Sequence, residues 1–445
     1  SLAKRRGFIY QGSEIYGGIS GTWDYGPLGV VLKRNIENAW RKKFVEERDD
    51  MYEIDAAILM NQNVWQASGH TEGFADPLVE CTSCKRRFRT DMLSEPFPKE
   101  ISEHMDEHHK KNENQLEFKC INCGKMNSTK VRQFNMMFKT HIGAAMDESG
   151  ISYLRPETAQ GMFVNFKNIV DSFHPELPFG MAQIGKAFRN EIAPRDFMFR
   201  SREFSQMEIE YFVRENEWEK YFEMWRKEML SWMEDIGLSK DSIHEVEVSP
   251  EDRAHYSKRT IDFEFEYPFG KKELYGLAYR TDFDLKSHME KSGVDLRYYD
   301  EKANERFLPH VIEPTFGIDR TVMAVLLSAY TEDEMGNEKR TVLKLPYSLA
   351  PIKVAVFPLL KNKLELVEKA KDIFSTLRKT IPAIAFDDNG NIGKRYRRQD
   401  EIGTPFCVTV DFQTLEDNTV TVRERDSGKQ ERISVDELPP SLKVE

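Results

Sequence analysis

One stretch of this sequence restricts the possible folds more than any other, because two runs of alternating polar and apolar residues flank a short loop. The stretch covers residues 183–213 and reads QIGKAFRNEIAPRDFMFRSREFSQMEIEYFV. A period of two places alternate side chains on opposite faces of a strand, so we predict two paired strands joined through Pro194 and Arg195. The residues of the second run that would face a core are Met207, Ile209 and Tyr211.

The opposite face of this hairpin would be polar. On the first run it carries Arg189 and Glu191. On the second run it carries Arg200, Arg202, Phe204, Gln206, Glu208 and Glu210. Guanidinium groups suit phosphate, an aromatic ring suits a nucleobase, and carboxylates suit an amine or a metal ion, so this face fits a nucleotide. Alternation alone, however, favours a solvated face laced with salt bridges.

The bulk composition allows several domains and argues against two classes of protein. With 445 residues and 40% hydrophobic content, the chain is long enough for two to four domains with sizeable cores. It has no run of about 18 apolar residues and no signal-peptide pattern, so we expect a cytoplasmic protein without a membrane partner. The net charge of −11 argues against a protein that coats DNA, although a local basic face would still bind RNA.

Four of the five cysteines form two Cys-x-x-Cys pairs, Cys81 with Cys84 and Cys120 with Cys123. In a chain without a secretion signal, this spacing indicates a metal site before disulfides. Zinc prefers four tetrahedral thiolates, and a small polar segment needs such a staple. We therefore predict an inserted module at residues 79–148 with structural Zn²⁺, with free thiols as the alternative. The histidines between the pairs are expected to be solvated: His104, His108 and His109.

A helix pattern follows a Gly/Pro turn near the N-terminus. Apolar residues recur every four positions: Leu28, Leu32, Ile36, Trp40 and Phe44. Such a helix would face the chain's own core or, alternatively, a dimer interface.

The C-terminal part of the chain predicts a separate α/β domain. The charged stretch 331–351 ends in prolines and predicts a linker. After it, strands are expected at 353–359, 406–412 and 419–425, and a helix at 364–377. A basic cluster also lies here, and by itself it would be a solvated face: Lys394, Arg395, Arg397 and Arg398.

Short motifs give a more specific prediction. FRNE at 188–191, followed by REF at 202–204, resembles motif 2 of the class II aminoacyl-tRNA synthetases, and GIDR at 317–320 resembles motif 3. The turn and helix at 25–44 resemble motif 1, whose role in that family is dimerisation. The three motifs occur in the family's order.

Further motifs indicate the glycyl branch of that family. They are SEIYGG at 13–18, RPETAQ at 155–160, VIEPTFG at 311–317 and GKRYRRQDEIG at 393–403. The chain thus resembles the dimeric glycyl-tRNA synthetases over nearly its whole length, although the family often has serine where Thr315 stands. The alternatives are a prolyl-, threonyl- or histidyl-type synthetase and a non-enzymatic accessory subunit of mitochondrial DNA polymerase.

The resemblance implies an α+β fold and a two-step ligase. A class II antiparallel sheet flanked by helices would form a catalytic domain at 1–340, with the Cys₄ module inserted at 79–148 and a mixed α/β anticodon-binding domain at 350–445. The enzyme would activate glycine with ATP and Mg²⁺ and transfer it to the 3′ end of tRNA-Gly. Its expected partners are ATP, glycine, tRNA-Gly and a second copy of the chain in a homodimer.

The resemblance also assigns site residues. Expected in catalysis are Arg189 at the α-phosphate, Arg320 at the distal phosphates and Glu273 as a Mg²⁺ ligand. The further ATP-binding residues are Asn190, Glu191, Phe199, Arg200, Arg202, Phe204 (stacked on adenine), Leu274, Gly317 and Asp319. The glycine-binding set is Arg89, Glu157, Phe204, Gln206, Glu208, Glu313, Thr315 and Gly317. The tRNA-binding set is Lys394, Arg395, Arg397 and Arg398.

Overall fold

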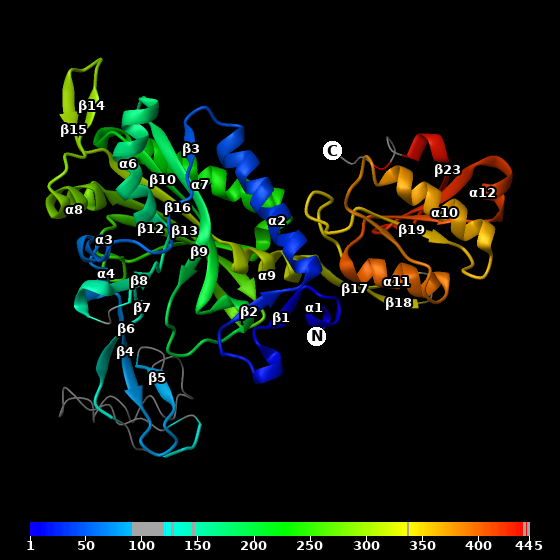
Figure 1. The fold of residues 1–445 in the computed structure, drawn as a ribbon, viewed down its shortest axis with the longest axis horizontal. Coiled ribbons are helices and arrows are strands. Elements are labelled where there is room, and N and C mark those ends of the chain that lie inside the picture. The colour runs from blue at the N-terminus through cyan, green and yellow to red at the C-terminus, as the bar shows by residue number, and fades with distance from the viewer. Residues whose placement is uncertain are drawn as a thin grey trace.

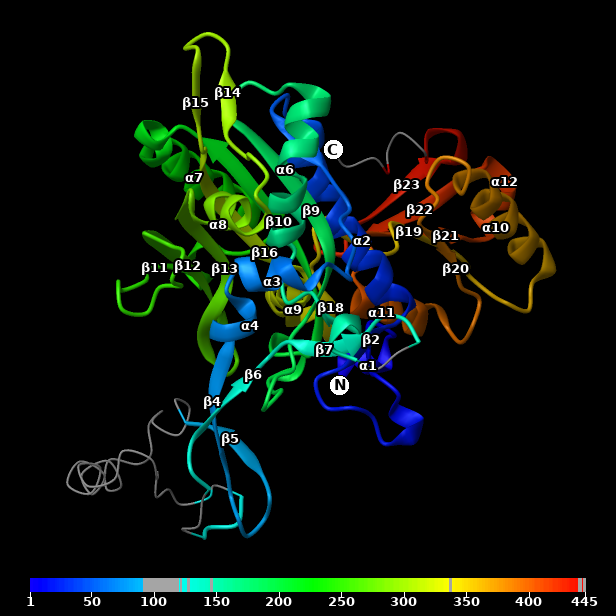
Figure 2. The same cartoon turned by 60° about the vertical axis from the view of Figure 1, so that its left-hand side comes forward.

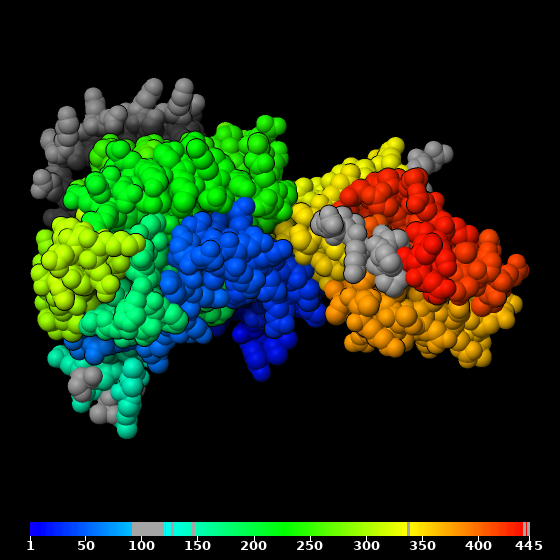
Figure 3. Space-filling view, turned by 90° about the horizontal axis from the view of Figure 1, so that it is seen from above, coloured from blue at the N-terminus to red at the C-terminus, as the bar shows by residue number. Residues whose placement is uncertain are grey.

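The computed structural model describes residues 1–90, 120, 122–125, 129–144, 147–335, 338–438 and 442. The chain forms a larger lobe from its N-terminal part and a smaller lobe from its C-terminal part (Figure 1). Seen from above, the two lobes meet at a narrow waist formed by the yellow segment that follows residue 330 (Figure 3).

A seven-stranded sheet forms the centre of the larger lobe, in the order β11-β12-β13-β16-β10-β9-β3. The strands are β3 (Met51–Glu53), β9 (Phe179–Phe188), β10 (Glu203–Val213), β11 (Ile243–Glu247), β12 (Arg259–Tyr267), β13 (Gly270–Thr281) and β16 (His310–Gly317). All neighbours are antiparallel except the edge pair β3 and β9, which is parallel.

The predicted hairpin is confirmed as β9 and β10, in which Glu208 lies opposite Gln183. The first strand ends at Phe188 and the second begins at Glu203, so the prediction that Arg189, Glu191, Arg200 and Arg202 lie on the strand face is wrong. These four residues lie in the connecting loop, which turns back through a short 3-10 helix at Phe197–Phe199.

Helices cover both faces of the sheet (Figures 1 and 2). One face packs α2 (Pro27–Arg41), α7 (Trp218–Asp235) and α9 (Ile318–Ala329) against the predicted core residues Met207, Ile209 and Tyr211. The other face packs α6 (Ala159–Phe173) and α8 (Phe283–Ser292) against Phe212 and Met181. Glu208 and Glu210 alternate with the core-facing residues and so point toward the second face.

Helix α2 buries the apolar stripe that the sequence predicted. Leu32, Ile36 and Trp40 are fully buried in the chain's own core, and Phe44, in the π-helical turn after α2, is 1% exposed. The apolar stripe of the motif-1 helix therefore packs into the chain's own core.

Smaller elements surround this sheet. Near the N-terminus lie α1 (Leu2–Arg5) and the paired strands β1 (Ile9–Gln11) and β2 (Trp23–Tyr25). The segment with the cysteines projects from the lobe as a three-stranded sheet of β4 (Ala75–Glu80), β5 (Arg87–Arg89) and β6 (Arg132–Asn135) (Figure 2). The remaining elements are α3 (Gln62–Ala67), α4 (His70–Gly73), β7 (Phe138–His141), β8 (Ile151–Leu154), β14 (Tyr298–Asp300) and β15 (Glu305–Phe307).

The smaller lobe is a five-stranded sheet in the order β20-β19-β21-β22-β23, covered by helices. Its elements are β19 (Val354–Pro358), α10 (Leu364–Leu377), β20 (Ile384–Phe386), α11 (Ile392–Ile402), β21 (Phe406–Val410), α12 (Phe412–Asp417), β22 (Thr419–Glu424) and β23 (Gln430–Ser434). The predicted strands and the helix at 364–377 are confirmed.

The segment predicted as a linker is more ordered than expected. Residues 330–343 form an antiparallel hairpin of β17 (Tyr330–Met335) and β18 (Glu338–Leu343). This hairpin continues directly from α9 and packs against α11 of the smaller lobe.

Candidate active site

Three neighbouring strands bring the predicted residues to one face of the large sheet. On β10 and β16, Glu208 lies opposite Thr315 and Gln206 lies opposite Gly317. On β13, Gly276 lies opposite Thr315 from the other side. A Cβ atom added at Gly276 would have only Oε1 of Glu273 within 4 Å, at 3.9 Å, so this face is open beside Thr315.

A cluster of buried acidic groups lies on this face, around and beyond Thr315. We call it the acid cluster, and each of its five members is at most 8% exposed: Glu157, Glu208, Glu210, Asp284 and Glu313. One guanidinium, that of Arg280, lies among them and is 1% exposed. Five carboxyl groups lie close together and the positive charge of Arg280 balances only part of their negative charge, so the cluster favours the binding of a cation.

Glu208 is held by hydroxyl and amide donors. Its carboxylate accepts hydrogen bonds from the backbone N–H of Thr158 at 3.1 Å and from the Thr158 hydroxyl, while the Thr315 hydroxyl donates to the other oxygen at 3.1 Å. Burial raises the pKa of Glu208, and the charge of Glu157 adds to the rise. Glu208 and Thr315, both predicted to bind glycine, are thus in direct contact.

Glu157 has different partners and an opposite shift. His70 Nε2 lies 3.3 Å from one carboxylate oxygen, and the side-chain amide of Gln160 donates to the other at 3.0 Å. Burial alone would raise the pKa of Glu157, but His70 holds it well below its ordinary value. Glu157 therefore carries a negative charge at neutral pH.

Glu313 is paired with Arg280, which the sequence did not single out. Arg280 Nη1 donates to Glu313 at 2.6 Å, and its other nitrogens form two 2.8 Å bonds to Asp284. Burial raises the pKa of Glu313 to about 8, although Arg280 opposes the rise. Glu210 beside it is fully buried, and within the described residues neither of its carboxyl oxygens has a hydrogen-bond partner.

Arg189 lies at the other end of this face. Its guanidinium is stacked between two rings, 5.4 Å from the centroid of Phe74 and 5.2 Å from that of Phe204, and its Nε donates to the Pro156 carbonyl at 3.1 Å. The ring predicted to stack on adenine thus lies against the arginine predicted to hold the α-phosphate. The two residues are close enough to serve one nucleotide.

Arg320 approaches from the first turn of α9. Its guanidinium lies 4.4 Å from the ring centroid of Phe199 and 3.1 Å from a carboxylate oxygen of Glu273. Arg320 lowers the pKa of Glu273, whose side chain is 48% exposed. Asp262 on β12 shares this environment, and burial, with the charge of Glu273, raises its pKa to about 7.

Several predicted nucleotide ligands are engaged by the protein itself. Glu191 pairs with Arg200 at 2.8 Å, and the Arg202 guanidinium donates to the carbonyls of Ser20 at 2.6 Å and Glu191 at 2.9 Å. Asp319 is 8% exposed. It accepts hydrogen bonds from the Tyr25 hydroxyl and from the Ser205 backbone, both at 2.6 Å. In this structure Arg202 and Asp319 therefore connect separate segments of the chain through hydrogen bonds.

The other members of the predicted sets lie around these groups. The Asn190 backbone N–H donates to the Met136 carbonyl at 2.7 Å, and the Leu274 side chain is buried in the core. Gln206 is 5% exposed, and its carbonyl oxygen has no hydrogen-bond partner within the described residues. Arg89 on β5 pairs with Asp76 at 2.6 Å. Burial lowers the pKa of Arg200, and the charge of Arg89 contributes, so Arg89 lies toward the motif-2 arginines.

The four cysteines of the projecting module converge, as the spacing predicts. Their sulfur atoms all lie within 4.8 Å of one another, and the pairs Cys81–Cys123 and Cys84–Cys120 are both 3.6 Å apart. A disulfide needs about 2.05 Å, whereas tetrahedral zinc with bonds of about 2.3 Å needs sulfur separations of about 3.8 Å. The donor set therefore fits zinc. The histidines 104, 108 and 109 lie outside the described residues.

The two Cys-x-x-Cys turns also share one backbone design. The amide four residues after each first cysteine donates to its carbonyl, from Lys85 to Cys81 at 2.8 Å and from Gly124 to Cys120 at 2.7 Å. In addition, the backbone N–H of Arg86 lowers the pKa of Cys84 to about 6. The amide of Arg86 thus favours the thiolate of Cys84, the form that binds a metal, whereas desolvation and the neighbouring thiols raise the pKa of Cys123 to about 11.

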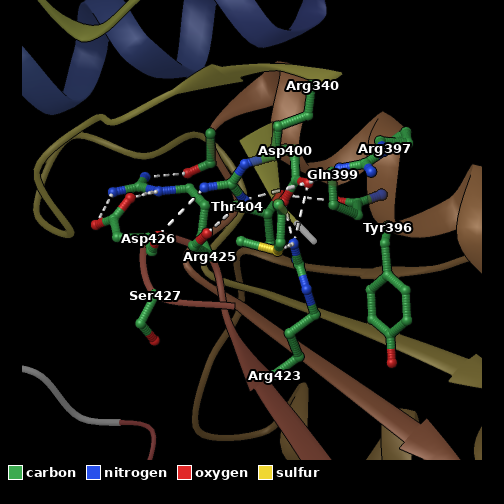
Figure 4. Close-up of polar contacts among 12 residues, drawn as sticks. Arg340, Tyr396, Arg397, Gln399, Asp400, Thr404, Arg423, Arg425, Asp426 and Ser427 are labelled. Carbon is green, nitrogen blue, oxygen red and sulfur yellow. Dashed lines mark hydrogen bonds and ion pairs between the residues drawn. The ribbon is translucent and has the colours of Figure 1, made fainter. Parts of the chain in front are cut away.

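The basic cluster of α11 is only partly available to a ligand. Arg395 is 1% exposed, and its guanidinium donates to the carbonyls of Pro358, Asp388 and Gly390, so the prediction that it contacts tRNA is wrong. Arg398 pairs with Asp387 at 2.7 Å. Arg397 lies 3.6 Å from Asp400, at the edge of the network in Figure 4. Lys394 is exposed.

The residues that the sequence reasoning missed share one property: their role depends on neighbours remote in the chain. His70, Asp262, Arg280 and Asp284 belong to no short motif that was used. A signal existed for one pair, because Arg280 and Asp284 are only four residues apart, although Arg280 lies near the end of β13 and Asp284 in the first turn of α8.

Comparisons with known proteins agree with this geometry. Residues 138–330 match the family described as "tRNA synthetase class II core domain (G, H, P, S and T)", and residues 353–445 match "Anticodon binding domain". In the described part of the chain, no helix is long and apolar enough to span a membrane.

Relatives with the same printed name cover almost the whole chain. The glycine–tRNA ligase of Thermobifida fusca is 50% identical over 99% of this chain and 96% of its own length. Those of Clostridium tetani and Clostridium acetobutylicum are also 50% identical, over 98% and 99% of this chain and 96% of their own lengths. The alternatives of another class II specificity and of a polymerase subunit are thereby set aside, and the chain belongs to the glycine–tRNA ligase family of class II aminoacyl-tRNA synthetases.

Proposed function

We propose that the acid cluster binds the ammonium group of glycine and that the face from Thr315 to Arg320 binds ATP. A glycine carboxylate oxygen attacks the α-phosphorus, the bond to the leaving pyrophosphate breaks, and glycyl-adenylate forms. A terminal ribose hydroxyl of tRNA-Gly then attacks the glycyl carbonyl, and AMP leaves. The observation that carries this proposal is the direct contact of Glu208 with Thr315 beside an open face of the sheet.

The selection of glycine depends on the Thr315 side chain, which we place next to the α-carbon of the bound amino acid. Glycine offers no side chain to grip, so the site must hold its charged ends and leave no room for a larger residue. Thr315 donates a 3.1 Å hydrogen bond to Glu208, so its side chain has a fixed position beside the ammonium site. Steric rejection of larger side chains makes a separate editing site unnecessary.

The nucleotide end supplies positive charge for a reaction between anions. We assign the α-phosphate to Arg189 and the distal phosphates to Arg320, since both guanidiniums are held by ring contacts next to the open face. Asp262 and Glu273 would hold Mg²⁺, which favours one or two carboxylates together with phosphate oxygens. The ion would neutralise phosphate charge and orient the leaving pyrophosphate.

A panel of amino acids tests this assignment. We expect ATP–pyrophosphate exchange with glycine, and background exchange with alanine, serine, proline, threonine and histidine. Thr315→Gly should admit alanine measurably, because the side chain that excludes a β-carbon is gone, whereas Thr315→Ser keeps Cβ and the hydroxyl on Glu208 and serves as the control. Exchange with another amino acid in place of glycine, or unchanged rejection of alanine by Thr315→Gly, would contradict the proposal.

We further propose that Cys81, Cys84, Cys120 and Cys123 hold one structural Zn²⁺. We expect about one zinc per purified chain and none in Cys120→Ser, because a site with three thiolates loses most of its affinity. Protease sensitivity of the module should rise in that variant. Cys407→Ser is the matched control, since Cys407 is buried in the smaller lobe and should leave the metal in place. Wild-type protein without metal would exclude the site.

The remaining partners follow from the same family. We propose that the smaller lobe binds the anticodon arm of tRNA, with Lys394 and the outer edges of Arg397 and Arg398 nearest to phosphates. We also propose a homodimer that covers the exposed apolar side chains of residues 13–20. Ile15 is 88% exposed and Tyr16 is 87% exposed, which suits a contact surface. The expected site of action is the cytoplasm.

A further inference from the structure

A second buried charge network, far from the acid cluster, joins the two lobes. Asp400 on α11 is fully buried and lies at its centre (Figure 4). Arg423 on β22 forms two hydrogen bonds to it, at 2.9 and 3.1 Å, and Arg397 lies 3.6 Å away. These contacts are internal to the smaller lobe.

Arg340 on β18 is the member that comes from outside that lobe. It lies 3.5 Å from Asp400, and its Nη1 and Nη2 donate to the backbone carbonyls of Arg425 at 2.7 Å and Asp426 at 3.2 Å. The remaining contacts go to Asp333 on β17, at 2.5 and 3.0 Å. Arg340 is 4% exposed, so one guanidinium joins both strands of the hairpin to two segments of the smaller lobe.

The packing around this guanidinium is close. A Cβ atom added at Gly428 would lie 2.4 Å from the Met335 side chain, and one added at Gly403 would lie 3.0 Å from the Leu343 carbonyl. Glu401, next to Asp400, also forms ion pairs with two residues of the larger lobe, Arg6 and, at 3.1 Å, Arg5. The hairpin is therefore seated in one orientation on α11 and the turn after β22.

The other end of the hairpin is fixed to the catalytic lobe. Strand β17 begins at the residue that follows α9, and the Lys344 backbone N–H donates to the Ala329 carbonyl at 2.7 Å. Helix α9 has 12 residues, about 18 Å, and carries Arg320 in its first turn. A continuous rigid path thus runs from the nucleotide end of the active site to the buried contacts of Arg340.

We infer that Arg340 is a positioning residue for tRNA charging: through the Asp400 network it fixes the orientation of the smaller lobe, so that a tRNA held at its anticodon arm presents its 3′ end to the adenylate. This inference rests on the proposed tRNA binding by the smaller lobe. A guanidinium suits the task, since its five N–H donors lie at fixed angles. Here they face the carboxylates of Asp333 and Asp400 and the backbone carbonyls of Arg425 and Asp426. Its role concerns only the transfer step, because glycyl-adenylate forms without tRNA contact.

The test compares Arg340→Met with wild type in the full-length chain. We expect glycine-dependent ATP–pyrophosphate exchange within about twofold of wild type, and kcat for charging full-length tRNA-Gly reduced by on the order of 10- to 100-fold, since small misplacements of a reactant cost about that much. An acceptor-stem minihelix without an anticodon arm should be charged equally by both proteins. A general loss of structure would instead lower ATP–pyrophosphate exchange, charging of tRNA-Gly and charging of the minihelix together.

Matched variants make the outcome decisive. Arg432→Met removes an arginine that pairs with Asp411 at 2.5 Å inside the smaller lobe, and it should leave all readings unchanged. If Arg340→Met does not fold, Asp333→Asn removes only one partner of that guanidinium and should give a weaker loss of the same kind. Equal charging of tRNA-Gly by wild type and variant, or equal losses with tRNA and minihelix, would overturn the inference. Failure of the wild type to charge tRNA would instead overturn the proposed function.

Discussion

Arg320→Ala should reduce glycyl-adenylate formation by about 10²–10³-fold, and Arg189→Ala should do the same. Each substitution removes a preorganised positive charge from the site where phosphate charge develops. Arg320→Ala should not unfold the protein, because Glu273, the ionic partner of Arg320, is half exposed and is hydrated when the arginine is lost. The measurement is glycine-dependent ATP–pyrophosphate exchange, together with thermal melting of each variant.

A surface arginine of the same lobe provides the comparison. Arg297 pairs with Asp295 at 2.9 Å, its side chain is 49% exposed, and Arg297→Ala should keep wild-type exchange and melting. Near-normal exchange by folded Arg320→Ala or Arg189→Ala would remove that residue from the phosphate site. A large drop in melting temperature with Arg320→Ala would mean that its contacts with Phe199 and Glu273 are structural.

Glu313→Gln should raise the KM for glycine by about 100-fold or more, since loss of one partner of a buried ionic contact costs about 2–5 kcal/mol. The KM for ATP should change little, because the nucleotide end lies on the other side of Thr315. Arg280 keeps its two bonds to Asp284 in this variant, so the fold of the cluster should survive. Exchange kinetics at varied glycine and ATP concentrations separate the two constants.

The pH profile of the wild type supplies an internal check on the same group. Glu313 has a pKa near 8, so below pH 8 it is mostly protonated and must lose its proton to pair with an ammonium. The KM for glycine should therefore fall as the pH rises from 6 to 8, by up to about tenfold per unit. Glu313→Gln should lack this dependence. A flat wild-type profile with a normal KM in the variant would place the ammonium elsewhere.

Local patterns in the sequence predicted much of the fold. The alternation at 183–213 is a property of neighbouring residues, and it located β9, β10 and the core face of Met207, Ile209 and Tyr211. The same pattern was wrong at Arg200 and Arg202, because it has no means of telling where a strand begins. There, the 3-10 turn at Phe197–Phe199 interrupts the chain before β10.

The number of charged residues in a local segment predicted its structural role less reliably than the short motifs did. The run from Lys394 to Arg398 is basic at every position except Tyr396, yet α11 turns Arg395 inward to three carbonyls and leaves Lys394 exposed. A helix rotates successive side chains by about 100°, so neighbours in a basic run end on different faces. Likewise, the charged stretch 331–351 suggested a linker, although Arg340 pairs with groups some 60 to 85 residues later.

The sequence by itself determined the family, through short motifs, and the four-cysteine donor set, through spacing. Only the tertiary structure decided which charges meet. Glu157, Glu208 and Glu313 come from three separate segments, and their pairing with His70, Thr315 and Arg280 depends on strand register and on how α6 and α8 dock. Burial raises the pKa values of Glu208 and Glu313, whereas His70 lowers that of Glu157. No local pattern encodes these shifts, because both the electrostatic partners and the loss of water arise from contacts between residues far apart in the chain.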